Sequence, residues 1–399
     1  MARAHQRTDA ALNVTSARDP RIDALRGAAL AGILLVNIQS YLYGAINPIG
    51  FLDTGASALD RIAHFATATF VAGKFMPLFG MLFGAGFSLL YQKLSATLAD
   101  PRAAYRRRLV FLFVFGIGHG LFLYFADITH AYALAGFVLL LYTDRDVGFV
   151  ARATLAWWIF AALWTLLLIV PSIGASSSVP IEWIEEARLN FEASVRLGYP
   201  DQWPLRAGLF VWQVQANLLA LPSVVALMMT GMLAHRSGWL GDLGTPAWSR
   251  AASLGLAVGL PAALGYGMWS ATHASLEENV LLPAWVLVLQ LLGPALSVFY
   301  AVMFLLHAPD FVVHWLAPAG RMPLTNYLLQ SVAMGALLSG WGLALGTNAS
   351  YAEVSALALG VFALQVVFSR WWLARYAQGP LEAAWRAWTY HGLVRTTPT

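Results

Sequence analysis

The sequence of 399 residues contains no cysteine and few charged residues, and each absence excludes a class of protein. Without cysteine there are no disulfide bonds, no thiolate nucleophile and no cysteine-held zinc. Asp, Glu, Lys and Arg make up 11% of the chain and hydrophobic residues 59%, whereas charged residues alone reach about 25% in a typical soluble domain. The composition therefore predicts an all-α, polytopic membrane protein, because helices satisfy their own backbone hydrogen bonds in lipid.

Metal-binding and nucleic-acid-binding patterns are also missing. The nine histidines follow no HExxH spacing, so no metal site is predicted. The net charge of +4 belongs to loops rather than to a basic surface interleaved with aromatic residues, so we expect no nucleic-acid partner. Residues 1–21 are polar and lack the apolar run and cleavage site of a signal peptide, so the first transmembrane helix is expected to direct insertion.

Ten apolar segments are separated by polar or basic loops, which predicts a bundle of about ten transmembrane helices. The bundle spans residues 22–378, between a polar cytoplasmic N-terminus (1–21) and a cytoplasmic tail (379–399), and it carries an extracytoplasmic insertion at 172–206. Most Lys and Arg fall in loops that this arrangement leaves in the cytoplasm. Both termini are therefore expected there, with the protein in the bacterial cytoplasmic (inner) membrane. The predicted crossings are 23–43, 61–92, 109–125, 130–142, 153–171, 207–233, 251–270, 280–306, 322–340 and 353–374.

The segment 105–142 contains the strongest sign of function, a histidine inside an apolar helix. His119 lies about 10 residues after the basic start at 106–108, which places it about 15 Å deep, near mid-membrane. An ionisable group at that depth is a functional-site candidate, although a lone histidine also serves simply to hydrogen-bond a neighbouring helix. A direct bond from His119 to Asp127 requires the helix to end before Asp127, which could instead cap the next helix. The flanking glycines that would let a neighbour approach closely are Gly116, Gly118 and Gly120.

Further polar residues lie deep in the first two crossings. Arg26 and Asn37 are 11 residues apart, so they share one helix face about 16 Å apart. Either both residues line a polar cavity, or Arg26 binds lipid phosphates while Asn37 hydrogen-bonds a neighbouring helix. Lys74 stands at a predicted helix break before Pro77, and irregular backbone at membrane depth requires a cavity or burial in protein.

The C-terminal third holds a second group of polar residues. Asn326 and Gln330 lie four residues apart on one helix face, just after Arg321 at the cytoplasmic boundary. Either they line the polar interior or they hydrogen-bond a neighbouring helix. Glu382 and Arg386 have the same spacing in the tail, where the alternative to a site is an ordinary surface ion pair.

Five blocks of sequence span these polar residues in order along nearly the whole chain. They are RIDALRGAALAGILLVNI (21–38), GKFMPLFGMLFGAGF (73–87), GIGHGLFLYFADITHAYALAGFVLLL (116–141), GRMPLTNYLLQS (320–331) and GPLEAAWR (379–386). Together they resemble the signature blocks of YeiB-like proteins, the domain-of-unknown-function 418 family. That family is similar to a wider transmembrane acyltransferase group, which includes heparan-alpha-glucosaminide N-acetyltransferases and bacterial sugar O-acetyltransferases.

The resemblance implies a transmembrane acyltransferase-like fold and an acyl-CoA co-substrate, acetyl-CoA first, bound from the cytoplasm. The acyl group would pass to a hydroxyl or amine of a sugar, lipid or secondary metabolite, reached from within or across the membrane. The expected partners are thus membrane lipids and a small-molecule or glycan acceptor, with a homodimer as a further expectation. The alternatives are a transporter or flippase for an anionic or glycosylated small molecule, and an inactive descendant that serves as a partner subunit.

The acyl-transfer hypothesis, together with the resemblance, assigns roles to individual residues. His119 and Asp127 are the expected catalytic pair. The chain departs from the family pattern at 126–129, where ADIT replaces GDIL, and at Ile22-Asp23. The O-acyltransferases tend to have histidine where Asn37 stands, so His119 would have to supply the base. The expected oxyanion or cavity residues are Asn37, Lys74, Tyr132, Asn326 and Gln330. The expected acyl-CoA-binding residues are Arg26, Arg321, Glu382 and Arg386.

Overall fold

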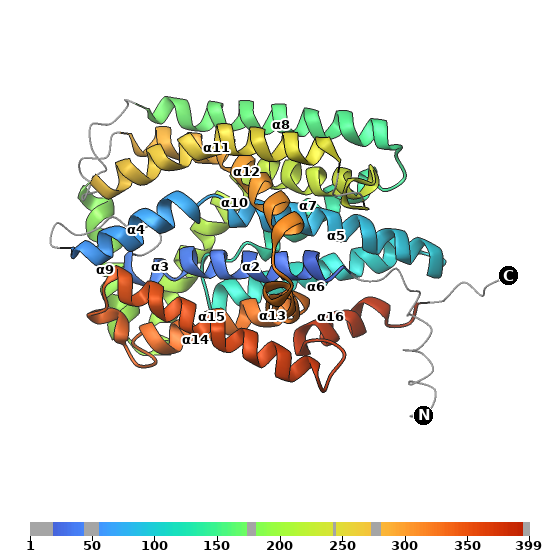
Figure 1. The fold of residues 1–399 in the computed structure, drawn as a ribbon. Helices are drawn as coiled ribbons and strands as arrows, with labels where there is room; N and C mark the ends of the chain where they lie inside the picture. Colours follow the sequence, from blue (N-terminus) through green and yellow to red (C-terminus); the bar gives the residue numbers. More distant parts are fainter. Residues whose placement is uncertain (1–18, 44–55, 174–180, 242–244, 273–280, 394–399) are drawn as a thin grey trace.

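Every regular element in the described part of the chain is a helix (Figure 1). The computed structural model describes residues 19–43, 56–173, 181–241, 245–272 and 281–393. Six helices in these ranges are long and apolar enough to cross a membrane, the broken pair α4–α5 counting as one. They are α4–α5 (Ala58–Phe70 and Phe75–Thr97), α8 (Val147–Ile169), α10 (Tyr199–Arg236), α11 (Pro246–Thr272), α12 (Leu282–His307) and α15 (Tyr351–Leu373).

The remaining helices are shorter or carry more charge, and four of them coincide with crossings expected from the sequence. α2 (Pro20–Asn37) carries charged residues in its first two turns, and α6 (Pro101–Phe122) carries the triple arginine. α7 (Thr129–Leu139) and α14 (Pro323–Leu338) have 11 and 16 residues. The others are α3 (Ser40–Tyr43), α9 (Ile181–Arg196), α13 (Asp310–Arg321) and α16 (Pro380–Tyr390).

Several elements differ from the sequence-based boundaries: α6 begins at Pro101 and α8 at Val147, before the crossings expected at 109–125 and 153–171. α10 begins at Tyr199, inside the insertion expected at 172–206, because Pro200 suits a first helical turn whose N–H groups have no intrahelical partner. α13 occupies a stretch that was expected to be only a connection between two crossings.

The predicted break in the second crossing is confirmed. α4 ends at Phe70 and α5 begins at Phe75. Gly73, between them, has φ +73°, a conformation that glycine adopts without steric cost. The side chain of Lys74 is fully buried, and its Nζ donates a hydrogen bond of 3.1 Å to the carbonyl of Ala68. The lysine therefore satisfies one of the carbonyl groups left open where α4 ends.

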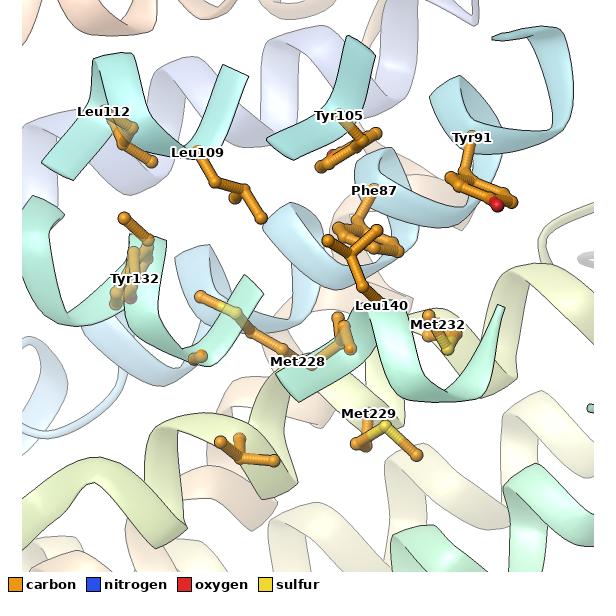
Figure 2. Packing of buried hydrophobic residues seen from close by; sticks show 14 of the residues in the cluster. Phe87, Tyr91, Tyr105, Leu109, Leu112, Tyr132, Leu140, Met228, Met229 and Met232 are labelled. Carbon is orange, nitrogen blue, oxygen red and sulfur yellow. The ribbon is translucent and has the colours of Figure 1, made fainter. Parts of the chain in front are cut away.

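The largest apolar cluster lies where α5, α6, α7 and α10 meet (Figure 2). Phe87 and Met228 are among its fully enclosed side chains. α5 and α10 also touch backbone to backbone. A Cβ atom on Gly84 would lie 1.9 Å from the carbonyl oxygen of Met228, and one on Gly231 would lie 1.8 Å from that of Met81. Small residues thus bring the two helices together, as is usual for helices in lipid.

A second close contact positions the C-terminal helices against α2. A Cβ atom on Gly320 of α13 would lie 1.7 Å from the carbonyl oxygen of Asp23, and one on Gly27 of α2 would lie 2.5 Å from that of Leu316. α14 leaves α13 directly after this contact. In Figure 1 the α2 and α6 ribbons run between α5 and the red and orange C-terminal helices.

Candidate functional site

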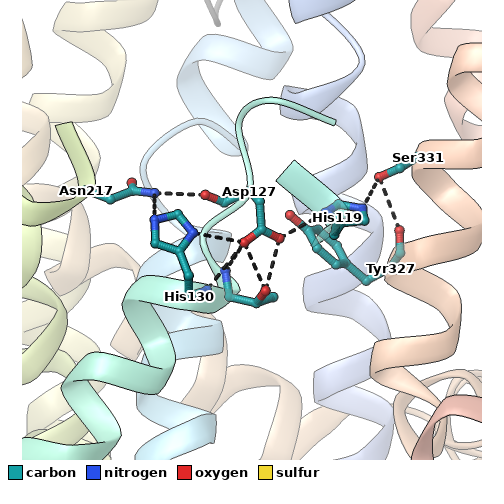
Figure 3. Close-up of polar contacts among 7 residues, drawn as sticks. His119, Asp127, His130, Asn217, Tyr327 and Ser331 are labelled. Carbon is teal, nitrogen blue, oxygen red and sulfur yellow. Dashed lines mark hydrogen bonds and ion pairs between the residues drawn. The ribbon is translucent and has the colours of Figure 1, made fainter. Parts of the chain in front are cut away.

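The His119–Asp127 pair anticipated from the sequence is formed. α6 ends at Phe122 and the chain turns back before α7 begins at Thr129, so Asp127 returns beside His119 (Figure 3). The Nδ1 atom of His119 lies 2.9 Å from Oδ2 of Asp127, and both side chains are fully buried. Gly116 makes this return possible, because a Cβ atom there would lie 2.5 Å from the main-chain nitrogen of His130.

Asp127 also caps α7, so both interpretations of this residue are correct. Its Oδ1 atom accepts hydrogen bonds from the main-chain N–H groups of Thr129 at 2.8 Å and His130 at 3.3 Å. The Thr129 hydroxyl donates to the same oxygen at 2.9 Å, and Nδ1 of His130 lies 3.1 Å away. So many donors around an enclosed group suit a carboxylate, which accepts hydrogen bonds and donates none.

The network continues on both sides of this carboxylate. Nε2 of His119 lies 2.9 Å from the hydroxyl of Ser331 on α14. On the other side, the Asn217 amide on α10 donates to the main-chain oxygen of Asp127 at 2.8 Å and lies 3.3 Å from Nε2 of His130. A buried chain of polar groups therefore connects α14, α6, α7 and α10 (Figure 3).

This arrangement fixes the proton positions on both histidines. A carboxylate that only accepts hydrogen bonds places a proton on Nδ1 of His119 and on Nδ1 of His130. Nε2 of His119 is then free to accept a proton from the Ser331 hydroxyl. Of the two imidazoles, only that of His119 has its basic nitrogen directed toward a hydroxyl group.

A small cavity adjoins this end of the network. Its volume is about 10 Å³, room for roughly one water molecule. It is lined by Leu34, Asn37, Tyr41, Tyr124, Tyr327, Gln330, Ser331 and Met334. Asn37 and Gln330 thus lie beside the His119 site, as expected of cavity residues, and His119 reaches the cavity through Ser331.

Three other expected cavity residues have separate hydrogen bonds. The Tyr132 hydroxyl donates to the carbonyl of Met76 at 3.1 Å. The Asn326 amide donates to the carbonyl of Ala319 and to the hydroxyl of Ser369, both at 3.0 Å, so it joins α13, α14 and α15. Lys74 bonds the end of α4, as described above. These contacts link helices, and none of them involves the His119–Asp127 network.

Of the expected acyl-CoA-binding residues, Arg26, Arg321 and Glu382 lie at the start of α14. The guanidinium of Arg26 pairs with Asp23 at 2.8 Å and lies 3.4 Å from the carbonyl of Gly320, the residue before Arg321. Glu382 accepts hydrogen bonds from the main-chain N–H groups of Leu324 at 2.7 Å and Thr325 at 3.1 Å, so its carboxylate caps α14. Arg386 lies over the ring of Tyr390, 5.8 Å from its centre, rather than against Glu382.

Sequence reasoning missed three members of the network, namely His130, Asn217 and Ser331. Each carried a weak signal. His130 follows Asp127 by three residues, the spacing at which a capping carboxylate meets the helix it caps. Asn217 is an amide inside a long apolar helix, and Ser331 directly follows Gln330.

Among the described residues, no three His, Asp or Glu side chains converge as metal ligands.

Fold and network define a class: a polytopic helical membrane protein with a buried His–Asp–His cluster. The family model described as "Protein of unknown function (DUF418)" matches residues 234–392. The chain is 30% identical to the uncharacterized protein YeiB of Escherichia coli (strain K12), over 93% of this chain and 96% of that protein. It is 27% identical to the uncharacterized protein YxaH of Bacillus subtilis (strain 168), over 94% and 95% of the two chains. No solved structure matches. The chain belongs to the YeiB-like, DUF418 family.

Proposed function

We propose that the protein transfers an acyl group, with acetyl as the first candidate, from acyl-CoA to a hydroxyl or amine, and that His119 is the general base. One observation carries the proposal: the imidazole is held by Asp127 through Nδ1 while its basic Nε2 faces a hydroxyl beside a cavity. This is the geometry in which a histidine removes a proton from an attacking group while a carboxylate stabilises the resulting imidazolium.

The cavity supplies the other requirement of acyl transfer, a donor for the oxyanion. Asn37 and Gln330 are among its lining residues, and the Gln330 amide also donates to the carbonyl of Leu30 and to Gln365. One well-placed donor contributes about 3–4 kcal/mol to stabilising a tetrahedral intermediate. Since the cavity has room for roughly one water molecule, turnover requires it to widen when the donor binds.

The proposed orientation places the acyl-CoA phosphates near Arg26 and Arg321, at the cytoplasmic end of a bundle of about ten crossings in the inner membrane. Ser331 follows Pro323, the first residue of α14, by eight residues, which corresponds to about 12 Å along the helix axis. A pantetheine arm that extends along α14 from the arginines would bring the thioester toward the cavity. The acceptor, a sugar, lipid or secondary metabolite, would approach from the Asn37 side.

The test uses full-length protein purified in detergent, with acetyl-CoA as the probe. We expect acetyl-CoA to raise the melting temperature and the protein to release free CoA thiol. His119→Ala should abolish thiol release and keep acetyl-CoA binding, while His64→Ala, which removes an equally buried histidine packed against Tyr351, should keep both. Thiol release by His119→Ala at the wild-type rate would remove the proposed base.

A second comparison tests the donor site. Arg26→Ala should weaken acetyl-CoA binding, because a guanidinium is suited to bind phosphate oxygens through paired hydrogen bonds. Arg375→Ala, which removes an arginine bonded to the carbonyl of Trp371, is the matched control and should leave binding unchanged. Equal affinities in the wild type and in Arg26→Ala would contradict the assignment of Arg26.

A transporter or flippase is the second candidate, and the buried Lys74 favours it. An ammonium enclosed at a helix break at membrane depth is typical of sites that bind ions or substrates in transporters. If the protein is a transporter, no CoA ester will change its melting temperature, and Lys74→Met will abolish substrate movement in vesicles. If it is an acyltransferase, Lys74→Met will retain CoA release.

A further inference from the structure

Ser331, His119 and Asp127 form a continuous hydrogen-bonded chain from three separate elements. The hydroxyl lies 2.9 Å from Nε2 of His119, and Asp127 lies 2.9 Å from Nδ1 of the same ring. This is the order of groups that activates a serine for attack on a carbonyl carbon. We propose that Ser331 is the nucleophile and carries the acyl group as an ester between donor and acceptor. This inference rests on the proposed acyl transfer.

The hydrogen bonds of Ser331 differ from those of Ser355 and Thr154 and resemble those of buried Ser297, which lies 3.3 Å from its i−4 carbonyl and 2.6 Å from the carbonyl of Lys74 on another element. Serine and threonine inside a helix commonly donate to the carbonyl four residues earlier. Ser355 does so at 2.8 Å and Thr154 at 2.7 Å. The corresponding distance from Ser331 to the carbonyl of Tyr327 is 3.4 Å. The Ser331 hydroxyl therefore lies closer to the imidazole than to the carbonyl of its own helix.

The cavity gives a second, independent reason to assign Ser331 as the nucleophile. Ser331 lines it, whereas the His119 ring lies behind Ser331 and is fully enclosed. Nε2 of His119 already has the Ser331 hydroxyl as its partner. An acceptor could use His119 as a direct base only by displacing that hydroxyl. Tyr41, Tyr124 and Tyr327 also line the cavity, and of these four hydroxyl-bearing residues Ser331 is the one bonded to the His119 imidazole.

The two half-reactions balance as follows. In the first, Oγ of Ser331 attacks the thioester carbonyl carbon, its proton moves to Nε2 of His119, the C–S bond breaks and the proton passes to the CoA sulfur. In the second, the hydroxyl or amine of the acceptor attacks the serine ester and gives its proton to Nε2. The C–Oγ bond then breaks and that proton returns to Oγ. Asp127 keeps its place on Nδ1 throughout.

An acyl-serine would also separate the two substrates in time. Ser331 lies eight residues after Pro323, where α14 begins next to Arg321, and it lines the cavity together with Asn37 and Tyr41. CoA could leave toward the arginines before the acceptor enters from the other side. A small cavity would therefore never need to hold both substrates together.

The first experiment mixes the full-length wild-type protein with acetyl-CoA in the absence of acceptor and stops the reaction with acid. We expect a burst of CoA thiol close to one per protein chain and an acetyl group on the peptide that contains Ser331. Ser331→Ala should lose the burst, the adduct and steady turnover, the last on the order of 10⁶-fold. Ser355→Ala, which removes a buried serine with an ordinary i−4 hydrogen bond, should keep all three.

A second variant tests the proposal even if Ser331→Ala fails to fold. Because the chain has no cysteine, Ser331→Cys introduces its single thiol. After incubation with acetyl-CoA and removal of the free nucleotide, this thiol should resist a maleimide label, and hydroxylamine should restore labelling by cleaving the thioester.

The outcomes separate the two proposals. If the wild type releases CoA but acetylates no serine, and Ser331→Ala turns over normally, Ser331 is not the nucleophile and acyl transfer stands. An adduct on His119 instead leads to the same conclusion. If the wild type releases no CoA from any acyl-CoA, acyl transfer and the acyl-serine are both refuted.

Discussion

Replacing Asp127 separates its two roles, because the two carboxylate oxygens have different partners. Oδ1 accepts from the main chain at the start of α7 and from His130, while Oδ2 meets the His119 ring; the Thr129 hydroxyl lies within 3.0 Å of both oxygens. Asp127→Asn can keep its oxygen at the Oδ1 position and place its amino group against Nδ1 of His119. The proton of that imidazole must then move to Nε2. The variant should fold with one charge-assisted hydrogen bond lost, a cost of about 1.5–3 kcal/mol.

The same substitution should nearly abolish catalysis. With the proton on Nε2, His119 can no longer accept one from a nucleophile, and the corresponding loss in a Ser–His–Asp enzyme is on the order of 10⁴-fold. Asp127→Ala should be less stable than Asp127→Asn, since leaving buried donors without their charge partner costs about 3–5 kcal/mol. Both effects are measured by unfolding in detergent and by CoA release from acetyl-CoA.

A matched control is the cap of α8. Asp146 accepts a hydrogen bond of 2.9 Å from the main-chain nitrogen of Phe149 and has no histidine partner. Asp146→Asn should change neither stability nor turnover, because asparagine caps a helix as well as aspartate does. The reasoning on Asp127 is refuted if Asp127→Asn releases CoA like the wild type, or if Asp127→Asn and Asp127→Ala unfold at the same temperature.

Three further substitutions test contacts around the site. Gly116→Ala should lower both stability and turnover, because its Cβ would clash with the main chain of His130. Gly118→Ala, whose Cβ would have nothing within 4 Å, should leave both unchanged. Melting temperature and CoA release distinguish the two variants. Glu382→Ala should cost about 1–2 kcal/mol, as for loss of a helix cap, and an unaltered melting temperature would show that α14 needs no cap from α16. Asn217→Ala should cost about 1–3 kcal/mol by removing the partner of Nε2 on His130; full stability in the melting assay would contradict that contact.

Sequence reasoning found the His119–Asp127 pair because both residues lie in one local segment. Eight residues separate them, so a single turn between two helices decides whether they meet. Ser331 lies 212 residues from His119, and Asn217 lies 90 residues from Asp127. No helical period connects positions so far apart. Their contacts depend on how α14 and α10 pack against α6 and α7, which single-sequence periodicity does not encode.

Glu382 illustrates the same limit at shorter range. The four-residue spacing to Arg386 left an ordinary ion pair along one helix as the alternative to a binding site. The first turn of α14 offers main-chain N–H groups that its own N-cap, Met322, leaves unsatisfied. These donors bind the Glu382 carboxylate instead. The described residues contain six helices with the length and composition of a membrane crossing, where ten crossings were expected. One reason is that α7 and α14, with 11 and 16 residues, are too short.

The glycine contacts determine where the bundle can open. α5 is fixed to α10 through Gly84, and α2 is fixed to α13 through Gly320, in both cases main chain against main chain. Such pairs cannot separate without losing many close contacts at once. Between α2 and α14, the side-chain link from Gln330 to the carbonyl of Leu30 measures 3.4 Å. We therefore expect the cavity to open by movement of α14 away from α2. Ser331 would then move relative to Leu34 and Asn37, the α2 residues that line the cavity, while α5 and α10 keep their positions.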